Sequence, residues 1–355
     1  MSLRVESLCV ELQAEGRRLR PVDGVSFEIP NQACVALLGE SGCGKSMTAL
    51  ALMRLLPETA RVAGGRVLLG EGGSDDVGVD LLTLPEAEMR GQRGSRVAMI
   101  FQEPMTSLNP VMTLAAQLGE ALATHRDLRG EAARQEAASL LESVGLPAAR
   151  LEAFPFQLSG GQRQRALIAM MLAGNPEVLI ADEPTTALDV TVQAQILELL
   201  NNLRRQRGMS LLLITHDLDV AGSMTQGADD RVAVMYAGQI VEWGPRQAVY
   251  GMSHHPYTQK LFAVLPRLDR RGQRLDSLPG RVPPADAVFS GCRFSDRCPQ
   301  AFARCHVEVP ALREVRPSHF ARCHLDVTRA INVPPNIVQS QSATVAVQSV
   351  LEIDD

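Results

Sequence analysis

Short apolar runs alternate with amphipathic stretches along the first 250 residues of the chain. The apolar runs are residues 34–38 (CVALL), 97–101 (VAMIF), 178–181 (VLIA) and 211–215 (LLLIT). Continuous runs of this length, without polar alternation, are typical of parallel strands that are buried on both faces. Helical periodicity predicts helices between them, at residues 45–56, 131–144 and 190–205. The chain is therefore predicted to be an α/β protein with a parallel sheet.

The order of these patterns divides the chain into four parts. Residues 1–102 and 177–250 carry the strand pattern and are predicted to form one α/β core. Residues 103–176 are mostly helical and are predicted to be a helical subdomain that is inserted into this core. Residues 251–326 are rich in Pro and Arg and contain four cysteines, so we expect a small Cys-rich C-terminal extension. Residues 327–355 are predicted to be a flexible tail.

The charge and the apolar content of the chain exclude several classes of protein. The chain has 35 basic and 40 acidic side chains, a formal net charge of −5, which argues against a nucleic-acid partner. No apolar run approaches the roughly 18 residues that a membrane-spanning helix needs, and the N-terminus lacks the apolar core of a signal peptide. We therefore expect a chain that starts in the cytosol, where its seven cysteines stay reduced.

A glycine-rich loop follows the first apolar run. Residues 39–46 (GESGCGKS) match G-x-x-x-x-G-K-[ST] and lie between a predicted strand and a predicted helix, the context that a phosphate-binding loop requires. The glycines let backbone N–H groups surround phosphate oxygens at the positive end of a helix dipole. Lys45 is expected to reach the β- and γ-phosphates, and the Ser46 hydroxyl to ligate Mg²⁺. The alternative is a glycine turn that is capped by a serine.

Two acidic residues end the third apolar run. Asp182 and Glu183 directly follow residues 178–181, and ligands bind at the carboxyl ends of parallel strands. We expect Asp182 to lie beside Mg²⁺ and Glu183 to polarise an attacking water. A solvated Asp-Glu-Pro turn is the alternative. His216 ends the next run, where an imidazole would stabilise charge on the γ-phosphate in the transition state, although a lone histidine is more often structural.

A serine–glycine motif, residues 158–162 (LSGGQ), precedes a predicted helix at residues 163–173. A glycine-rich N-cap accounts for its shape but not for its place among the other motifs. The order is phosphate loop, Gln102, LSGGQ, Asp182 with Glu183, Asp189 and His216. In this order the motifs resemble the nucleotide-binding subunit of an ATP-binding cassette (ABC) transporter. The resemblance covers residues 1–250 and implies a P-loop NTPase (RecA-like) core that binds ATP and Mg²⁺.

The resemblance also implies a role for each site residue. Two cassettes are expected to face each other head to tail, so that the LSGGQ motif of one contacts the ATP that is held by the other. The implied catalytic residues are Lys45, Gln102, Glu183 and His216, and the implied Mg²⁺ ligands are Ser46, Gln102 and Asp182. The implied nucleotide contacts are Gly39, Ser41, Gly42, Gly44, Lys45, Ser46, Met47, Ser159, Gly161, Gln162 and Asp189, of which Asp189 would lie across the dimer seam.

One position departs from the family pattern. The family usually stacks adenine on an aromatic residue in the first strand, and the equivalent residue here is Leu12. A leucine packs on a base but offers no π-face, so contact with the base would be weaker or would come from elsewhere in the protein.

Four cysteines, Cys292, Cys298, Cys305 and Cys323, follow a C-x5-C-x6-C-x17-C spacing. Four thiolates suit a tetrahedral zinc ion or an iron–sulfur cluster, and four free thiols are the third alternative. The surrounding residues, together with 255–258 (HPYT), resemble the C-terminal extension of oligopeptide and dipeptide importer ATPases. In that family the cysteines are associated with a [4Fe-4S] cluster, which the resemblance implies here.

The whole pattern predicts the ATPase subunit of a bacterial peptide importer, peripheral on the cytoplasmic face of the cell membrane. Its expected partners are a second cassette (a paralogue or a second copy), two transmembrane permease subunits and, indirectly, a periplasmic peptide-binding protein. Residues 103–109 and the helical subdomain are expected to receive the permeases. The same role with another cargo (nickel, glutathione or a peptide antibiotic), a non-transport cassette protein and a binding module with vestigial ATPase activity are the alternatives.

Overall fold

The computed structural model describes residues 2–14, 16–70, 78–102, 107–186, 188–263 and 280–326. The predicted tail, residues 327–355, and residues 103–106 of the predicted permease-contacting segment lie outside the described residues.

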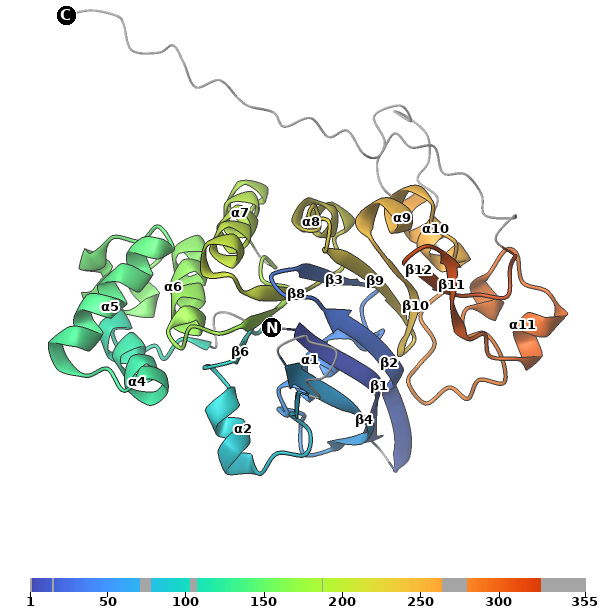
Figure 1. The fold of residues 1–355 in the computed structure, drawn as a ribbon, viewed down its shortest axis with the longest axis horizontal. Helices are drawn as coiled ribbons and strands as arrows, with labels where there is room; N and C mark the ends of the chain where they lie inside the picture. The colour runs from blue at the N-terminus through green and yellow to red at the C-terminus, as the bar shows by residue number, and fades with distance from the viewer. Residues whose placement is uncertain are drawn as a thin grey trace, which may run out of the picture.

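Within the described residues, an eight-stranded sheet runs through the centre of the molecule in the order β11-β12-β10-β9-β3-β8-β7-β6 (Figure 1). Its parallel part consists of β3 (Cys34–Leu38), β6 (Val97–Ile100), β7 (Val178–Asp182), β8 (Ser210–Thr215) and β9 (Arg231–Tyr236). Every residue of β3, β7 and β8 is buried, which explains their continuous apolar sequences. The predicted α/β class with a parallel sheet is confirmed.

A second, antiparallel sheet has the order β2-β1-β4-β5. Its strands are β1 (Ser2–Ala14), β2 (Arg17–Ile29), β4 (Ala60–Gly70) and β5 (Val79–Asp80). One apolar cluster joins the two sheets and the helix between them: it includes Val5 and Val25 from the second sheet, Leu37 from the main sheet and Leu52 from the helix. The phosphate loop thus lies at the junction of the two sheets, because it connects β3 to that helix.

Helices cover the other face of the main sheet and form a block at one end of the molecule (Figure 1). A second apolar cluster holds them together and includes Leu118, Leu140 and Leu167 from the block and Leu211 from β8. The helices are α1 (Lys45–Leu52), α2 (Glu86–Gln92), α4 (Leu114–Arg126), α5 (Gly130–Ser143), α6 (Gly160–Leu172), α7 (Val190–Arg207), α8 (Leu218–Met224), α9 (Arg246–Gly251), α10 (Pro256–Ala263) and α11 (Ala303–Val307). Short 3-10 turns are η1 (Ala148–Glu152), η2 (Pro155–Gln157) and η4 (Ser295–Arg297).

The predicted helix at residues 45–56 is shorter than expected. α1 ends at Leu52, well before Pro57. Arg54 has a φ of 51°, in the left-handed region, and the Leu55 N–H donates to the Leu50 carbonyl at 2.8 Å. This backbone turn closes the helix one turn before the proline.

The C-terminal extension is part of the main sheet rather than an appendage. Its strands β11 (Leu312–Arg316) and β12 (His319–Arg322) form a hairpin, and β12 pairs antiparallel with β10 (Gln239–Gly244) of the core. Glu242 on β10 is fully buried and lies 2.7 Å from Nε2 of His319 on β12. The extension therefore shares a hydrogen-bonded and buried interface with the core.

Candidate functional site

The predicted site residues gather because four parallel strands end at one edge of the sheet. In the sheet β3 neighbours β8, β8 neighbours β7, and β7 neighbours β6. The phosphate loop follows β3, His216 follows β8, Glu183 follows β7, and Gln102 follows β6. The structure therefore brings these residues together, as the sequence predicts.

The phosphate loop requires glycine at its two ends. Gly39 has a φ of 155° and Gly44 a φ of 109°, in the region that side-chain-bearing residues rarely adopt. A Cβ atom on Gly44 would lie 2.1 Å from the Pro21 carbonyl oxygen, and one on Gly39 would lie 2.3 Å from the Met235 carbonyl oxygen. The loop is thus packed between β2 and the end of β9, where there is no space for a side chain.

Lys45 is the buried cation of the loop. Lys45 is the first residue of α1, and it is 6% exposed. Its ammonium group donates to the carbonyls of Gly39 at 2.8 Å and of Glu40 at 3.0 Å. The ammonium group therefore lies inside the curve of the loop, where a bound phosphate needs a positive charge. Ser41 and Gly42 are exposed at the crest of the loop, and Met47 packs on the apolar cluster beneath it.

Asp182 and Ser46 form a pair that fits a divalent cation. Asp182 is 3% exposed, and its Oδ1 atom has no hydrogen-bond partner among the described residues. Burial raises the pKa of Asp182, while a hydrogen bond with Ser46 and the charge of Lys45 act in the opposite direction. A buried carboxylate oxygen without a partner is costly unless a ligand uses it, and Mg²⁺ prefers such oxygen ligands. The carboxylate and hydroxyl therefore suit the Mg²⁺ that the sequence predicts.

Glu183 is held by three polar side chains. Its Oε1 atom lies 3.0 Å from Nδ1 of His216, and its Oε2 atom accepts from Thr186 at 3.0 Å and from Gln102 at 3.3 Å. Its φ of 47° is in the left-handed region, which for a glutamate is a strained backbone. Thr186 was not predicted as a site residue. Its place three residues after Glu183, next to a predicted turn, is the sequence signal that indicates it.

The surroundings of Glu183 keep it ionised. Burial alone favours the neutral acid, but the hydrogen bonds from His216 and Thr186 and the charge of Lys45 outweigh it. The pKa of Glu183 is consequently below its ordinary value. An ionised carboxylate that accepts hydrogen bonds at a strand end has the properties of a general base.

The LSGGQ motif lies apart from the phosphate loop. Ser159 caps α6: its hydroxyl accepts from the Gln162 N–H at 3.3 Å, and the Gln162 side chain accepts from the Ser159 N–H at 3.1 Å. Asp189 caps α7 by accepting from the Val192 N–H at 2.9 Å. A Cβ on Gly161 would lie 2.7 Å from a Val192 methyl group, so α6 and α7 pack closely here. Figure 1 places α6 with the helical block and α1 below the main sheet, so one chain does not bring these groups together.

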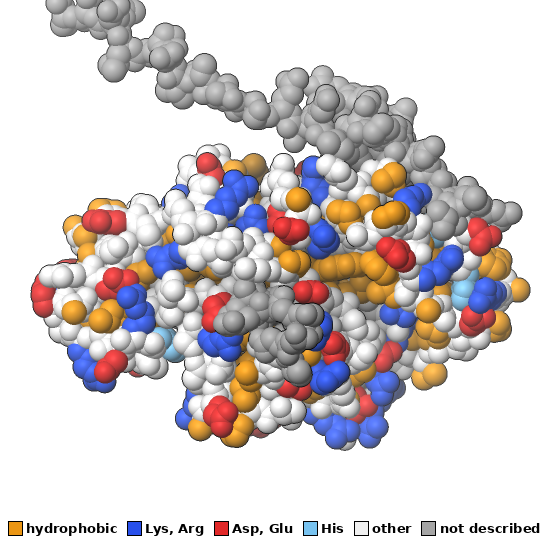
Figure 2. Space-filling view, viewed as in Figure 1, with side chains coloured by type: hydrophobic (Ala, Val, Ile, Leu, Met, Phe, Trp, Pro, Cys, Tyr) orange, Lys and Arg blue, Asp and Glu red, His pale blue; other side chains and the backbone are white. Residues whose placement is uncertain are grey.

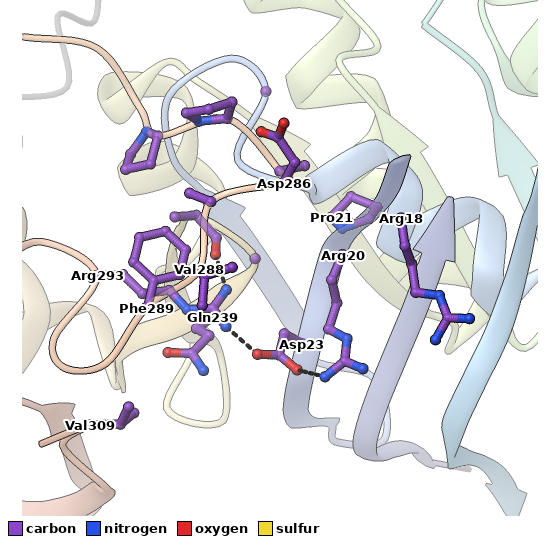
Figure 3. A pocket seen from close by; sticks show the side chains of 17 residues that line it. Arg18, Arg20, Pro21, Asp23, Gln239, Asp286, Val288, Phe289, Arg293 and Val309 are labelled. Carbon is purple, nitrogen blue, oxygen red and sulfur yellow. Dashed lines mark hydrogen bonds and ion pairs between the residues drawn. The ribbon is translucent and has the colours of Figure 1, made fainter. Parts of the chain in front are cut away.

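A cavity of about 390 Å³ adjoins the phosphate loop at Gly42 (Figure 3). β2 forms one wall, and residues 283–289 of the C-terminal extension form the opposite wall. The Arg20 N–H donates to the Ala285 carbonyl at 2.9 Å, so the extension runs along the edge of β2. The wall contains one aromatic side chain, Phe289, whose ring centre lies 4.8 Å from the Arg293 guanidinium carbon.

Leu12 lies near the turn between β1 and β2 and pairs with Leu19 and Ala60. The opposite side of the hairpin is charged: buried Glu11 accepts from Arg20 at 3.0 Å and from Arg61 at 2.9 Å. Figure 2 shows basic side chains gathered over this end of the second sheet. The cross-strand partners of Leu12, Leu19 and Ala60, are therefore aliphatic, and neither offers an aromatic ring on which adenine could stack.

The four cysteines of the extension lie near one another. The Cys292 N–H donates to the Cys305 carbonyl at 2.7 Å. Burial, together with the charges of the three other thiols, raises the pKa of Cys323 to about 12. Among the described residues, however, no group of three or more His, Cys, Asp or Glu side chains is arranged to hold a metal ion. The positions of the thiols therefore do not support the predicted metal site, although their donor chemistry suits one.

The fold and this edge of the sheet define the class of protein. The ATP-binding cassette MJ0796, in a dimeric post-hydrolysis state bound to ADP and phosphate, superposes with a TM-score of 0.59 and 25% identity over 69% of this chain and 98% of that chain. A second dimeric structure of MJ0796 has a TM-score of 0.57, 26% identity and coverage of 67% and 96%. This chain therefore has the fold of a nucleotide-binding ABC cassette.

Sequence comparison narrows the class. A family model described as ABC transporter matches residues 22–186, and one described as oligopeptide/dipeptide transporter, C-terminal region, matches residues 241–305. The dipeptide transport ATP-binding protein DppD of Bacillus subtilis is 46% identical over 311 residues, 87% of this chain and 90% of that protein. A relative from Brucella abortus (strain 2308) is also 46% identical, over 89% of this chain and 95% of its own. The chain belongs to the ABC transporter family, with a C-terminal region of the oligopeptide/dipeptide type.

Membership of this family makes the protein an ATPase that uses ATP and Mg²⁺. In the part of the chain that the structure describes, no helix combines the length and the apolar character that crossing a membrane demands.

Proposed function

We propose that this chain is the ATP-hydrolysing subunit of a bacterial peptide importer. The observation that carries the proposal is the hydrogen-bonded Glu183 beside buried Asp182 and the phosphate loop, on a chain whose C-terminal region matches the oligopeptide/dipeptide type. Sequence similarity to DppD, which is named as a dipeptide transport protein, supports peptides as the cargo. Nickel, glutathione or a peptide antibiotic is the alternative cargo.

The residues of the sheet edge have distinct roles in hydrolysis. Lys45 and the amides of the loop hold the β- and γ-phosphates. Ser46, Asp182 and Gln102 would hold Mg²⁺, which would neutralise phosphate charge. Glu183 orients a water molecule and accepts its proton as the water oxygen bonds to the γ-phosphorus. The bond between that phosphorus and the bridging oxygen breaks, and ADP leaves with the bonding electrons. His216 contacts Glu183 through Nδ1, which leaves Nε2 for the γ-phosphate. With Nδ1 donating to Glu183, Nε2 donates to the phosphate when the imidazole carries both protons.

A second cassette completes the site. Ser159, Gly161 and Gln162 sit at the start of α6, away from the phosphate loop of their own chain, and Asp189 starts the neighbouring helix α7. We propose that two cassettes meet head to tail, so that these residues contact the γ-phosphate that the partner cassette holds. A helix N-terminus with a serine hydroxyl suits an anion. ATP then closes the dimer, and hydrolysis lets it reopen.

The remaining partners follow from the importer role. Two permease subunits would carry the transmembrane path, with a periplasmic binding protein delivering cargo, and this chain would sit on the cytoplasmic side of the membrane. The helical subdomain, residues 103–176, is the proposed permease-contacting part, inserted between residues 1–102 and 177–250. Residues 251–326 form the proposed extension.

We further propose that Cys292, Cys298, Cys305 and Cys323 hold a [4Fe-4S] cluster. What supports this is the donor chemistry of the four thiols, in a region that matches the oligopeptide/dipeptide type. Metal analysis of anaerobically purified protein tests it. We expect iron and sulfide in stoichiometric amounts, which Cys298→Ser removes and Cys34→Ser leaves unchanged. Stoichiometric zinc, or no metal, would contradict the cluster.

Purification of the tagged full chain from detergent-solubilised membranes of its host tests the importer role. We expect two integral membrane subunits and a second cassette to co-purify with the Glu183→Gln variant in ATP and Mg²⁺. Ser159→Arg in the same background should retain the permeases but lose the closed cassette pair. A chain that brings down no membrane subunit would overturn the proposed function. The cargo is then identified by measuring the uptake of a labelled dipeptide in cells that lack this gene and in cells to which it has been restored. Gene-dependent uptake of nickel, without uptake of the dipeptide, would contradict peptides as the cargo.

A further inference from the structure

The C-terminal extension binds directly to the phosphate loop. Glu40 is the second residue of that loop, and both of its carboxylate oxygens accept from Arg297 of the extension, at 2.9 and 3.1 Å. The Glu40 N–H donates to the Tyr257 hydroxyl at 3.1 Å, and Tyr257 belongs to α10. Two parts of the extension that are far apart in sequence therefore hold one residue of the nucleotide site.

The Arg297 side chain is fixed rather than free to move. It is 7% exposed, its guanidinium donates to the Tyr236 hydroxyl at 3.2 Å, and it lies against the rings of Tyr236 and Phe294. Those two rings and Tyr257 form one buried cluster, with ring centres 4.6 to 5.4 Å apart. A two-pronged arginine–carboxylate pair that is packed on aromatic rings has a defined geometry, unlike a surface ion pair.

A second arginine of the extension, Arg293, contacts residues that lie next to the loop. Arg293 donates to the Ala237 carbonyl and forms an ion pair with Asp23 on β2. The next residue, Gly238, donates its N–H to the carbonyl of Cys43 in the phosphate loop at 2.9 Å. Figure 3 shows Arg293 reaching from the extension toward Asp23. Arg293 therefore acts on the loop through the turn between β9 and β10.

These contacts orient the backbone of the loop. The carbonyl of Glu40 accepts from the Lys45 ammonium at 3.0 Å, its N–H is held by Tyr257, and its carboxylate is held by Arg297. Glu40 is thus held through its carbonyl, its N–H and its carboxylate. A loop that binds phosphate with its backbone must keep its N–H groups turned inward, and holding it so before ATP arrives lowers the ordering cost of binding.

We propose that Arg297, with Arg293 as a second support, is a positioning residue through which the C-terminal extension sets the affinity of the phosphate loop for ATP. Both arginines lie between Cys292 and Cys298, so the conformation of the cysteine segment is transmitted to the nucleotide site. The inference rests on ATP binding at the loop, and it adds the extension as a part of that site.

Nucleotide titration of the full chain tests this role. Each variant is made in the Glu183→Gln background, so that ATP is bound but not consumed, and ATP affinity is measured by calorimetry with Mg²⁺. We expect Arg297→Met to weaken affinity about tenfold, and Arg297→Lys to weaken it less, because lysine keeps the charge but loses the second hydrogen bond. Arg304→Met is the matched control: Arg304 lies in α11 of the same extension and forms an exposed pair with Glu308, so we expect unchanged affinity.

A double-variant comparison separates positioning from general damage. If Arg297 acts through Glu40, Arg297→Met combined with Glu40→Gln binds ATP no more weakly than the weaker single variant. In the hydrolysing background, KM for ATP should rise with kcat within about twofold of the unmodified chain. Additive losses in the double variant, or equal affinity of Arg297→Met and Arg304→Met, would overturn the proposal.

Two milder variants keep the proposal testable if Arg297→Met does not fold. Glu40→Gln and Arg297→Lys keep the shape of the interface, so they remain testable if Arg297→Met does not fold. Both binding ATP as tightly as the unmodified chain would overturn the proposal. An unmodified chain that binds no ATP would instead contradict the nucleotide site itself, so the two failures are distinguishable.

Discussion

Nδ1 of His216 lies 3.0 Å from Oε1 of Glu183, although the two residues are 33 positions apart in the chain. They meet because β7 and β8 are adjacent parallel strands, in which Asp182 pairs with Ile214 and the Glu183 N–H donates to the Ile214 carbonyl at 2.9 Å. The pairing sets the side chain of the acid beside the imidazole that follows the next strand. The charge of Lys45 in the phosphate loop also acts on the Glu183 carboxylate, so the pair lies within electrostatic reach of that loop.

Glu183→Gln is expected to lower kcat for ATP hydrolysis by at least roughly a hundredfold while leaving ATP affinity within a few-fold. Glutamine keeps the shape of the side chain but cannot accept a proton from water. Phosphate release and ATP binding are measured on the same preparation, with Glu198→Gln on the exposed face of α7 as the control. If Glu183→Gln hydrolyses ATP as fast as the Glu198→Gln control, Glu183 is not the catalytic base.

Thr186→Val is expected to move the acidic side of the pH–rate profile to higher pH. The pKa of Glu183 lies below its ordinary value, so the carboxylate is ionised above that pKa and activity is lost as the pH falls through it. Valine removes one hydrogen bond to the carboxylate, which raises its pKa and shifts the loss by up to roughly one pH unit. The profile of kcat/KM checks this, with exposed Thr124→Val as the control. Superimposable profiles would show that Thr186 does not tune the acid.

Gly44→Ala is expected to abolish ATP binding. The new Cβ would lie 2.1 Å from the Pro21 carbonyl oxygen, and the φ of 109° is unfavourable for alanine, so the loop has to distort. The matched control is Gly119→Ala in α4, where a Cβ meets nothing within 4 Å and the helix gains about 0.5–1 kcal/mol of stability. Calorimetric titration with ATP, together with thermal unfolding, distinguishes local distortion from unfolding. ATP binding by Gly44→Ala at the affinity of the control would contradict the described loop.

Asp230→Ala is expected to lower the free energy of unfolding by roughly 3–5 kcal/mol. Asp230 is 3% exposed and accepts from Arg204 at 2.7 Å, from the Cys34 N–H at 2.7 Å and from the Gly227 N–H at 2.7 Å. Its removal leaves a buried guanidinium and two amides without this acceptor. Urea unfolding followed by circular dichroism measures the loss. The exposed pair of Arg304 and Glu308 provides the comparison, and Glu308→Ala should leave the unfolding midpoint unchanged.

Local signals predicted most of the core correctly. The apolar run at residues 34–38 coincides with β3, and the amphipathic stretch at 131–144 is one residue out of register with α5. These elements are predictable because burial on both faces, or on one helical face, leaves a period in the sequence. The predicted end of α1 was wrong. Arg54 closes the helix by adopting a left-handed backbone conformation, and nothing in an arginine's side chain predicts that conformation from the sequence. Strands β11 and β12 were not predicted, since β12 pairs with β10, whose partner residues lie 77 and 79 positions earlier in the chain.

The sequence by itself determined the chemistry of the nucleotide site. The spacing within residues 39–46, the acids after β7 and the histidine after β8 are local patterns, and the parallel sheet brings them to one edge. Only the tertiary structure decided that Thr186 and Gln102 hold Glu183, and that Arg297 holds Glu40 from 257 positions away. The physical reason is that a charged or hydroxyl side chain has no periodicity: its partner is set by the packing of distant elements, and only the folded chain specifies that packing.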